Sequence, residues 1–156
     1  MQLQQVRLEN GVKQYPAAIT GTIRQFCQTL YDELLTSGYS LLPDDIENIA
    51  LTNVKKLAGW ARLDAQMLDD DSIDPAFFEL TLDISLLADE WVLVEPVIRA
   101  HCDLLQARRM EGSQAMGVQA FGVSSSEANQ IYQGLLEQMK KEAFIHEPFN
   151  IELGDS

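Results

Sequence analysis

Apolar residues recur every three or four positions along several stretches of this chain, the spacing that gathers them on one face of an α-helix. The first stretch follows Pro16, which suits the first turn of a helix, and should end at Gly38, just beyond the helix. Residues 1–14 alternate apolar and polar side chains and should form a short strand or an extended arm. The apolar face of this first helix comprises Ile19, Ile23, Phe26, Cys27, Leu30, Tyr31 and Leu34.

A second helical pattern begins at Pro43, where Asp44 and Asp45 would interact favourably with the N-terminal end of the helix dipole. It should end near Leu68, before the acidic and turn-rich segment 69–75. Its apolar face comprises Ile46, Ile49, Ala50, Val54, Leu57, Trp60 and Ala61.

The third helical pattern starts near Pro75 and continues to about Glu111, with Pro96 inside it. A proline within a helix removes one backbone hydrogen bond and crowds the preceding turn. The sequence therefore predicts a kink, or two helices that meet near Val94–Glu95.

A long loop is expected over residues 111–123, which contain three glycines. Its length suggests a working segment rather than a simple connection. Val118, Phe121 and Val123 give it apolar side chains with which it can contact a neighbour.

The last helix should open on Ser124 and Glu127, which match a capping box with Ser124 as the N-cap. It is expected to end at about Phe144, because Pro148 prevents much continuation. The acidic residues 147–156 then form an extended C-terminal arm that becomes ordered against a partner.

These patterns predict an all-α fold: a bundle of four to five helices with a long flexible loop and extended termini. Residues 1–146 should form a single helical domain, followed by the arm 147–156. The 156 residues, 46% of them hydrophobic, suffice for a substantial core. Cys27 and Cys102 are expected to be buried thiols within it rather than a disulfide.

The composition also restricts the function. No apolar run reaches the ~20 residues that a membrane span needs, and the N-terminus lacks the apolar segment of a signal peptide. We therefore expect no membrane partner and synthesis in the cytoplasm. The net charge of −13 opposes simple binding to a phosphate backbone, which relies on clustered cations.

No pattern for catalysis or metal binding stands out. The acidic run 69–74 lacks the ligand spacing and the glycine of a calcium loop, and His101 and His146 have no partner at metal-ligand spacing. Neither a nucleophile elbow nor a phosphate-binding glycine loop is present. We expect no cofactor, no metal and no enzyme, with His101 as a packing or surface residue. A small helical enzyme whose site is assembled in space is a third hypothesis, after the two given below.

Cations in the middle of the chain allow two interpretations: a solvated face, or a docking patch for an acidic surface of an identical neighbour, such as its acidic tail. These cations are Lys55, Lys56, Arg62, Arg99, Arg108 and Arg109. Aromatic residues in the loop and tail are candidate anchors at an interface. The predicted partner-binding residues are Val118, Phe121, Val123, Arg108, Arg109, Phe144, Phe149 and Ile151.

The second half of the chain resembles the head–tail connector (neck or adaptor) proteins of tailed bacteriophages. The likeness lies in residues 86–96, LLADEWVLVEP, followed by a helix with Leu104-Leu105. It continues through the loop that ends in residues 121–129, FGVSSSEAN, a final helix, and an aromatic tail from Phe144 to Phe149.

This resemblance implies a structural virion protein that forms a ring of about twelve copies between portal and tail. Its partners would be further copies of itself, the portal protein, and tail or neck proteins, and DNA would pass through the channel without sequence-specific binding. This is the first hypothesis. The second is a soluble acidic helical interaction module, such as a chaperone, an immunity protein or a regulatory adaptor, that binds a basic partner.

Overall fold

The computed structural model describes residues 7–9, 12–14, 19–66, 79–114 and 123–146. These residues form four α-helices, one short 3₁₀ turn and four short strands, which confirms the predicted all-α bundle. The helices are α1 (Ile23–Thr36), α2 (Pro43–Trp60), α3 (Ala88–Gln114) and α4 (Ser125–His146). The strands are β1 (Arg7–Glu9), β2 (Val12–Gln14), β3 (Ile19–Thr22) and β4 (Ser85–Leu87), and the turn is η1 (Asp64–Gln66).

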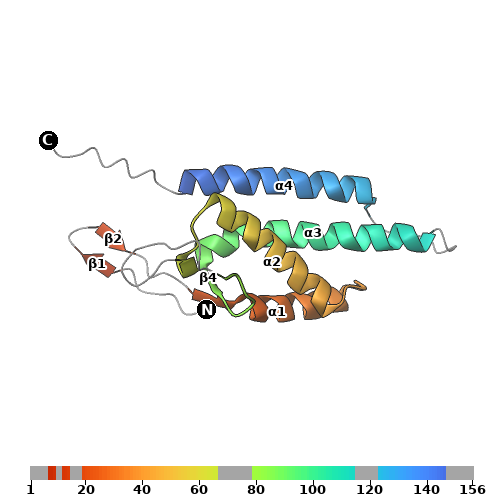
Figure 1. The fold of residues 1–156 in the computed structure, drawn as a ribbon, viewed down its shortest axis with the longest axis horizontal. Coiled ribbons are helices and arrows are strands. Elements are labelled where there is room, and N and C mark those ends of the chain that lie inside the picture. Colours follow the sequence, from red (N-terminus) through yellow and green to blue (C-terminus); the bar gives the residue numbers. More distant parts are fainter. Residues whose placement is uncertain (1–6, 10–11, 15–18, 67–78, 115–122, 147–156) are drawn as a thin grey trace.

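The two longest helices, α3 and α4, lie antiparallel along the long axis of the molecule, and α1 and α2 pack beside them (Figure 1). Helix α2 contacts all three other helices, so it lies at the centre of the packing. The hydrophobic core runs between the helices, and its largest fully buried side chains include Ile23, Leu30, Ile46, Leu57 and Ile98. No helix of the described part has the length and apolar character needed to cross a membrane.

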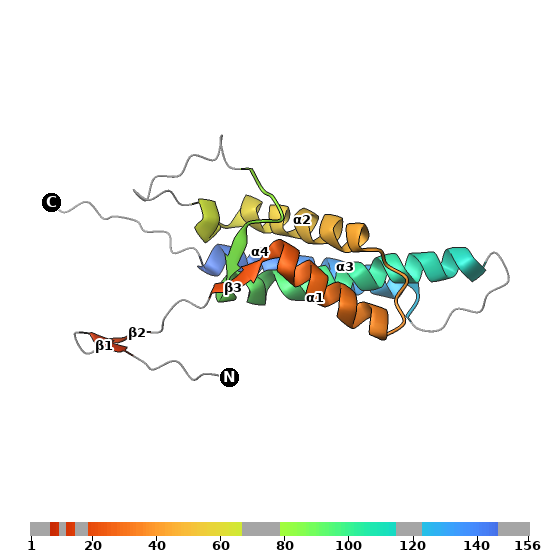
Figure 2. The same cartoon turned by 90° about the horizontal axis from the view of Figure 1, so that it is seen from below.

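The four strands form two antiparallel pairs. Strands β1 and β2 pair with each other, so the prediction of a short strand within residues 1–14 is confirmed. Strand β3 pairs with β4, aligning Thr22 with Ser85, at the end of the bundle where α1 begins (Figure 2). The pairing joins segments that are far apart in the sequence.

The first helix starts later than predicted. Residue Ile19 lies in β3 rather than on the helix, and α1 begins at Ile23. Gly21 adopts the left-handed conformation (φ 96°) where the register of β3 is irregular, and the Thr22 hydroxyl then caps the helix by accepting the Gln25 N–H. The Gln25 side chain accepts the Thr22 N–H in return, a complete capping box.

Helix α2 starts at Pro43 as predicted but ends at Trp60, well before Leu68. Beyond the end of the helix, Leu63 is buried in the core, with 1% of its surface exposed. Glu90 holds this turn in place, because its carboxylate accepts the Asp64 N–H at 3.0 Å and the Leu87 N–H at 2.9 Å.

The prediction that the third helix begins near Pro75 is wrong, because α3 starts at Ala88. The described residues before it form a turn and the strand β4 instead, and they satisfy the first turn of α1: the Ile84 and Leu82 carbonyls accept the Ile23 and Arg24 N–H groups at 2.9 and 2.8 Å. A helix start leaves such groups without an intrahelical partner. This tertiary pairing explains why the segment is not helical.

Of the two outcomes predicted near Val94–Glu95, two separate helices are wrong, since α3 continues through Pro96 as one helix, and a kink at Pro96 stays a prediction. Pro96 is exposed, so water can reach the carbonyl that loses its hydrogen bond. At its other end α3 extends to Gln114, which takes the first four residues of the predicted loop 111–123 into the helix. Residues 115–122 and the arm 147–156 lie outside the described residues.

The predicted N-cap and end of α4 and the buried cysteines agree with the structure, whereas the second half of the predicted capping box, from Glu127 back to Ser124, does not occur within the described residues. The Ser124 hydroxyl accepts the Glu127 N–H at 3.2 Å, so Ser124 is the N-cap of α4, and the helix ends at His146, two residues beyond Phe144. Both cysteines are buried free thiols. Burial raises the pKa of Cys27 and of Cys102 to about 12, which leaves them as unreactive parts of the core.

Candidate functional site

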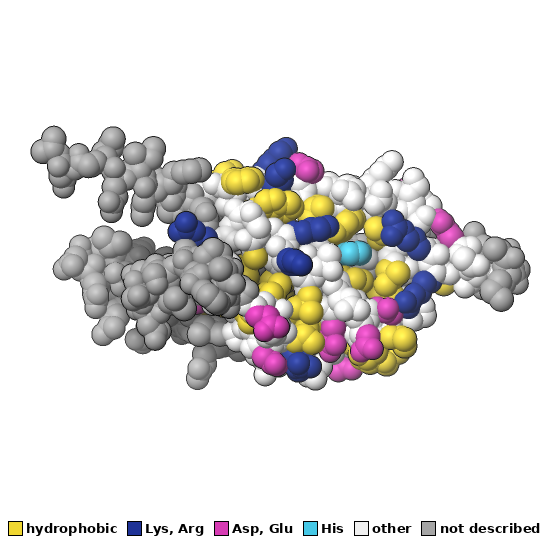
Figure 3. Space-filling model, viewed as in Figure 1, with side chains coloured by type: hydrophobic (Ala, Val, Ile, Leu, Met, Phe, Trp, Pro, Cys, Tyr) yellow, Lys and Arg dark blue, Asp and Glu magenta, His cyan; other side chains and the backbone are white. Residues whose placement is uncertain are grey.

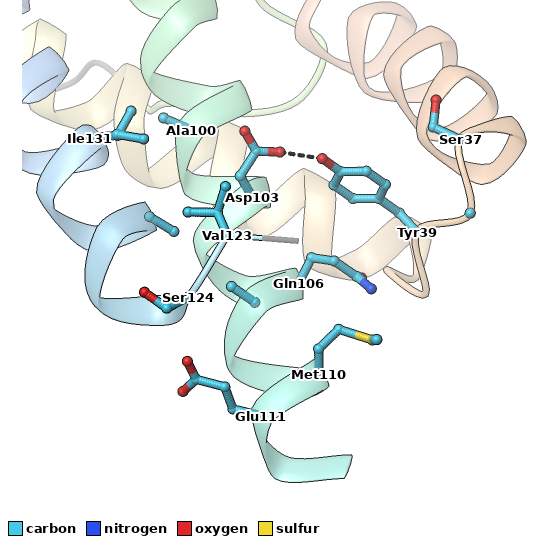
Figure 4. A pocket seen from close by; sticks show the side chains of 13 residues that line it. Ser37, Tyr39, Ala100, Asp103, Gln106, Met110, Glu111, Val123, Ser124 and Ile131 are labelled. Atoms are coloured by element: carbon cyan, nitrogen blue, oxygen red, sulfur yellow. Dashed lines mark hydrogen bonds between the residues drawn. The ribbon is translucent and has the colours of Figure 1, made fainter. Parts of the chain in front are cut away.

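A cleft of about 680 Å³ opens at the end of the bundle where α1 ends and α4 begins (Figure 4). Helix α3 forms its floor, the turn between α1 and α2 forms one wall, and the first turns of α4 form the other. This volume is within the range of protein ligand sites, and the cleft is open along its length rather than closed around a small molecule.

The turn wall is built on Gly38, whose φ of +86° is the left-handed conformation that ends many helices. The Tyr39 N–H then returns to the Leu34 carbonyl at 3.0 Å. The Tyr39 hydroxyl donates to the Asp103 carboxylate on α3. Burial, and then this hydrogen bond, raise the pKa of Tyr39 to about 12, so the phenol is a permanent donor near neutral pH.

Two further bonds fix the same wall to α3. The Gln106 side-chain oxygen accepts both the Ser40 N–H at 3.0 Å and the Ser40 hydroxyl at 3.1 Å. Arg109 forms an ion pair with Asp45 at 2.9 Å and also donates to the Ser40 carbonyl at 3.3 Å. The turn is therefore attached to α3 at three positions, Asp103, Gln106 and Arg109.

The opposite wall is held by Glu111. Its two carboxylate oxygens accept the Ser125 N–H at 2.7 Å and the Ser125 hydroxyl at 2.6 Å. These hydrogen bonds lower the pKa of Glu111, and its charge lies at the positive end of the α4 dipole. Both walls are thus pinned to one helix, and the cleft is formed before any partner arrives.

Small side chains make the cleft hollow. Ala100 and Ala107 of α3 and Ala128 of α4 are buried in it, and the flexible side chain of Met110 is half-buried. Val123 and Ile131 on the α4 side are each 53% exposed. An apolar lining of this kind, with the Asp103 carboxylate nearby, suits an apolar segment that carries a cation or a hydrogen-bond donor.

A second polar cluster joins α2, α3 and α4. Asn53, fully buried, donates to the Ile49 carbonyl at 2.8 Å and lies 3.0 Å from Nδ1 of His101. The Tyr132 hydroxyl donates to the Asn53 oxygen at 3.0 Å, and Lys56 Nζ donates to the Tyr132 oxygen at 3.0 Å. Because the Asn53 amide donates to Nδ1, the His101 ring is neutral with its proton on Nε2.

The environment of His101 favours the neutral ring. Burial lowers its pKa first, and the charges of Lys56 and Arg108 lower it further. The ring also packs on Tyr132, with centroids 4.6 Å apart. His101 is therefore a packing residue, one of the two roles that the sequence allowed.

The predicted partner-binding residues fall in different places. Val123 lies on the cleft wall, and Phe144 is 50% exposed at the far end of α4. Arg109 forms an ion pair with Asp45, whereas the charge of Arg108 lowers the pKa of His101. The two arginines, although adjacent in sequence, therefore have different neighbours. Val118, Phe121, Phe149 and Ile151 lie outside the described residues.

Sequence reasoning missed the residues that build the cleft walls: Tyr39, Asp103, Gln106 and Glu111. Their role depends on contacts between distant segments, and no local signal marks them. Asn53 did carry a signal, because it is a polar residue on an otherwise apolar helix face. Within the described residues, no group of three or more histidine, cysteine or carboxylate side chains is arranged to hold a metal ion.

No protein-family model matches this chain, and neither the curated proteins nor the solved structures contain a significant match to it.

Proposed function

We propose that this chain is a non-enzymatic assembly protein of a tailed-phage virion, a head–tail connector subunit that forms a ring between portal and tail. The observation that carries the proposal is the preformed cleft on α3, whose α4 wall exposes Val123 and Ile131. The resemblance in the second half of the chain supplies the virion context.

The cleft suits contact with a polypeptide segment. Ordering a mobile site on binding costs conformational entropy, and the bonds of Tyr39, Gln106 and Glu111 remove much of that cost beforehand. The hollow left by small residues accepts larger apolar side chains, and Met110 can adjust to their shape. A connector subunit would use such a cleft to grip a segment of a neighbouring copy or of the portal.

A closed ring also needs two different surfaces, because each copy contacts its neighbours head to tail. Phe144 and Ile145, 50% and 77% exposed, form a second apolar surface at the C-terminal end of α4. They lie at the opposite end of α4 from Val123 (Figure 1), ~30 Å away at the rise of an α-helix. Two separate apolar surfaces support the assembly role.

The test is sedimentation velocity of the full-length chain over increasing concentration, alone and with a portal protein. We expect a ring species or co-assembly for the native chain, and its loss in Ile131→Asp. The matched control is Val92→Asp, because Val92 is 72% exposed on α3 and does not line the cleft. A native chain that remains monomeric in both settings, or an Ile131→Asp chain that assembles normally, contradicts the proposal.

The second candidate is an acidic interaction module that binds one basic protein. The observation in its favour is the acidic character of the site, since the Asp103 carboxylate lines the cleft and the chain carries a net charge of −13. Stoichiometry separates the two candidates, because a one-to-one complex with a basic protein, without self-assembly, favours the module.

A further inference from the structure

At least one cation on each of α2, α3 and α4 has no carboxylate partner within the described part of the chain. Arg24, Arg99 and Arg109 each form an ion pair within the bundle. Lys56, Arg108 and Lys140, by contrast, pair with no carboxylate among the residues that the structure describes. We call these three cations, with Trp60 and Tyr132 beside them, the α2–α4 basic face.

Figure 3 shows several dark-blue Lys and Arg side chains around the histidine, with yellow apolar side chains between them. The chain has 11 lysines and arginines against 24 aspartates and glutamates. These unpaired cations therefore give one face of an acidic protein a local positive charge.

Aromatic rings hold two of these cations in place. Lys56 Nζ donates to the Tyr132 hydroxyl at 3.0 Å and lies 5.4 Å from the centre of its ring. Lys140 Nζ lies 5.8 Å from the centre of the Trp60 ring. Cation–π contacts leave the ammonium hydrogens that point away from the ring available to an anion. The face thus offers fixed positive charges beside apolar surface.

One segment of the chain has the complementary chemistry. Residues 147–156 carry Glu147, Glu152 and Asp155 and no lysine or arginine. In an extended strand Phe149 and Ile151 point to the same side, because side chains alternate with a period of two. Glu147 and Asp155 lie on that same side of the strand, whereas Glu152 lies on the other side. The segment can therefore place an apolar side chain against the half-buried Trp60 while the carboxylates of Glu147 and Asp155 meet the cations.

We infer that the α2–α4 basic face binds the acidic C-terminal segment 147–156 of a neighbouring copy. The inference rests on the proposed assembly function and names the surfaces of one contact between subunits. The sequence favours binding to a neighbouring copy over binding to the same copy. Glu147 precedes Pro148, and a residue before proline prefers extended backbone. No glycine occurs before Gly154 that would help the chain to turn back. Ten extended residues span up to ~33 Å, which is enough to cross the face of another subunit.

The experiment uses two full-length variants with opposite charge changes. The face variant carries Arg108→Glu and Lys140→Glu, and the arm variant carries Glu147→Lys and Asp155→Lys. Each variant alone brings like charges together at the contact, so the concentration at which half of the protein is assembled should rise by roughly tenfold or more. In an equal mixture, the negative face of one variant meets the positive arm of the other, and assembly should return.

Native mass spectrometry of each variant and of the mixture gives the readout. The control carries Gln28→Glu and Asn48→Asp, two exposed positions away from the face, and should assemble like the native chain. Circular dichroism confirms that every variant is folded. Loss in each variant with recovery in the mixture supports the inference. Normal assembly of either variant, or loss without recovery in the mixture, overturns it and leaves the assembly function standing, whereas a native chain that never assembles removes the assembly function itself.

Discussion

The Tyr132 hydroxyl of α4 donates a hydrogen bond of 3.0 Å to the side-chain oxygen of Asn53, which is fully buried in α2. Asn53 in turn holds His101 of α3, so one buried amide joins three helices. A polar group that is buried without a hydrogen-bond partner destabilises the folded state, because it has also lost its hydrogen bonds to water. Removing a partner of the Asn53 amide should therefore lower the stability of the bundle.

Replacing Tyr132 with phenylalanine should destabilise the bundle by about 1–3 kcal/mol, because the Asn53 oxygen loses its donor in the core. Lys56 also loses its contact with the hydroxyl. Urea unfolding followed by circular dichroism measures the effect. Tyr31→Phe is the matched control, since Tyr31 is half-buried and its hydroxyl has no hydrogen-bond partner among the described residues. Equal stability of the two variants contradicts this role of Asn53.

Stability should also depend on pH through His101. Its pKa is lowered in the folded chain, so the unfolded chain binds a proton more readily than the folded chain. The contribution of the neutral ring is therefore complete above the ordinary histidine pKa of about 6.5 and declines as the pH falls below it. Protonation would remove the acceptor that Asn53 uses.

The measurement is the free energy of unfolding between pH 7.5 and 5.5 for the native chain and His101→Gln, which lacks a titrating ring. The difference between the two chains isolates His101 from the many carboxylates. We expect the native chain to lose stability relative to the variant as the pH falls. A constant difference across this range would show that His101 keeps its ordinary pKa.

The α4 wall of the cleft should loosen when Glu111 is replaced by glutamine. The amide keeps one acceptor oxygen but loses the charge that favours both bonds to Ser125 and the helix dipole. Hydrogen exchange should become faster at the Ser125 amide while the interior of α4 is unchanged. Glu127→Gln is the control, because no hydrogen bond of the Glu127 carboxylate occurs within the described part. Unchanged exchange at Ser125 contradicts the anchoring role.

Neither cysteine should react with a thiol reagent at pH 8 in the native protein. Burial raises the pKa of Cys27 and Cys102 to about 12, so almost no thiolate is present and the sulfur atoms are covered. In denaturant both should react within minutes. Titration with a chromogenic disulfide measures this, and rapid labelling of the native chain would show that the core opens at one of the two helices.

The periodicity of apolar residues was sufficient to predict the existence of the helices, their number and the buried thiols. It failed at boundaries that contacts between distant segments decide. Ile19 and residues 85–87 were expected to be helical, yet they form strands because β3 pairs with β4. Residues 82 and 84 are not helical either, and their carbonyls complete the first turn of α1. The local preference for helix is weak enough for such pairing to override it.

The candidate site was predictable only in part. Val123 was expected at a contact surface because it is an apolar residue beside a glycine-rich segment, and it does line the cleft. The hollow itself depends on Tyr39 meeting Asp103, 64 residues away, and on Glu111 reaching Ser125 across the connection between α3 and α4. The two residues of each pair are not separated by a helix or strand repeat, so a sequence pattern does not predict their contact. The sequence also grouped Arg108 with Arg109, although adjacent residues on a helix point in directions ~100° apart.

The central claim is that the cleft on α3 is a surface through which this chain binds its partners. Hydroxyl-radical footprinting of the full-length chain, compared before and after assembly with itself or with a portal protein, tests it most directly. Met110 lines the cleft and Tyr31 lies outside it, and both are half-buried, so they report at comparable starting exposure. We predict that oxidation of Met110 slows several-fold on assembly while that of Tyr31 is unchanged. Oxidation of Met110 at the same rate in the assembled and unassembled chain would contradict the claim.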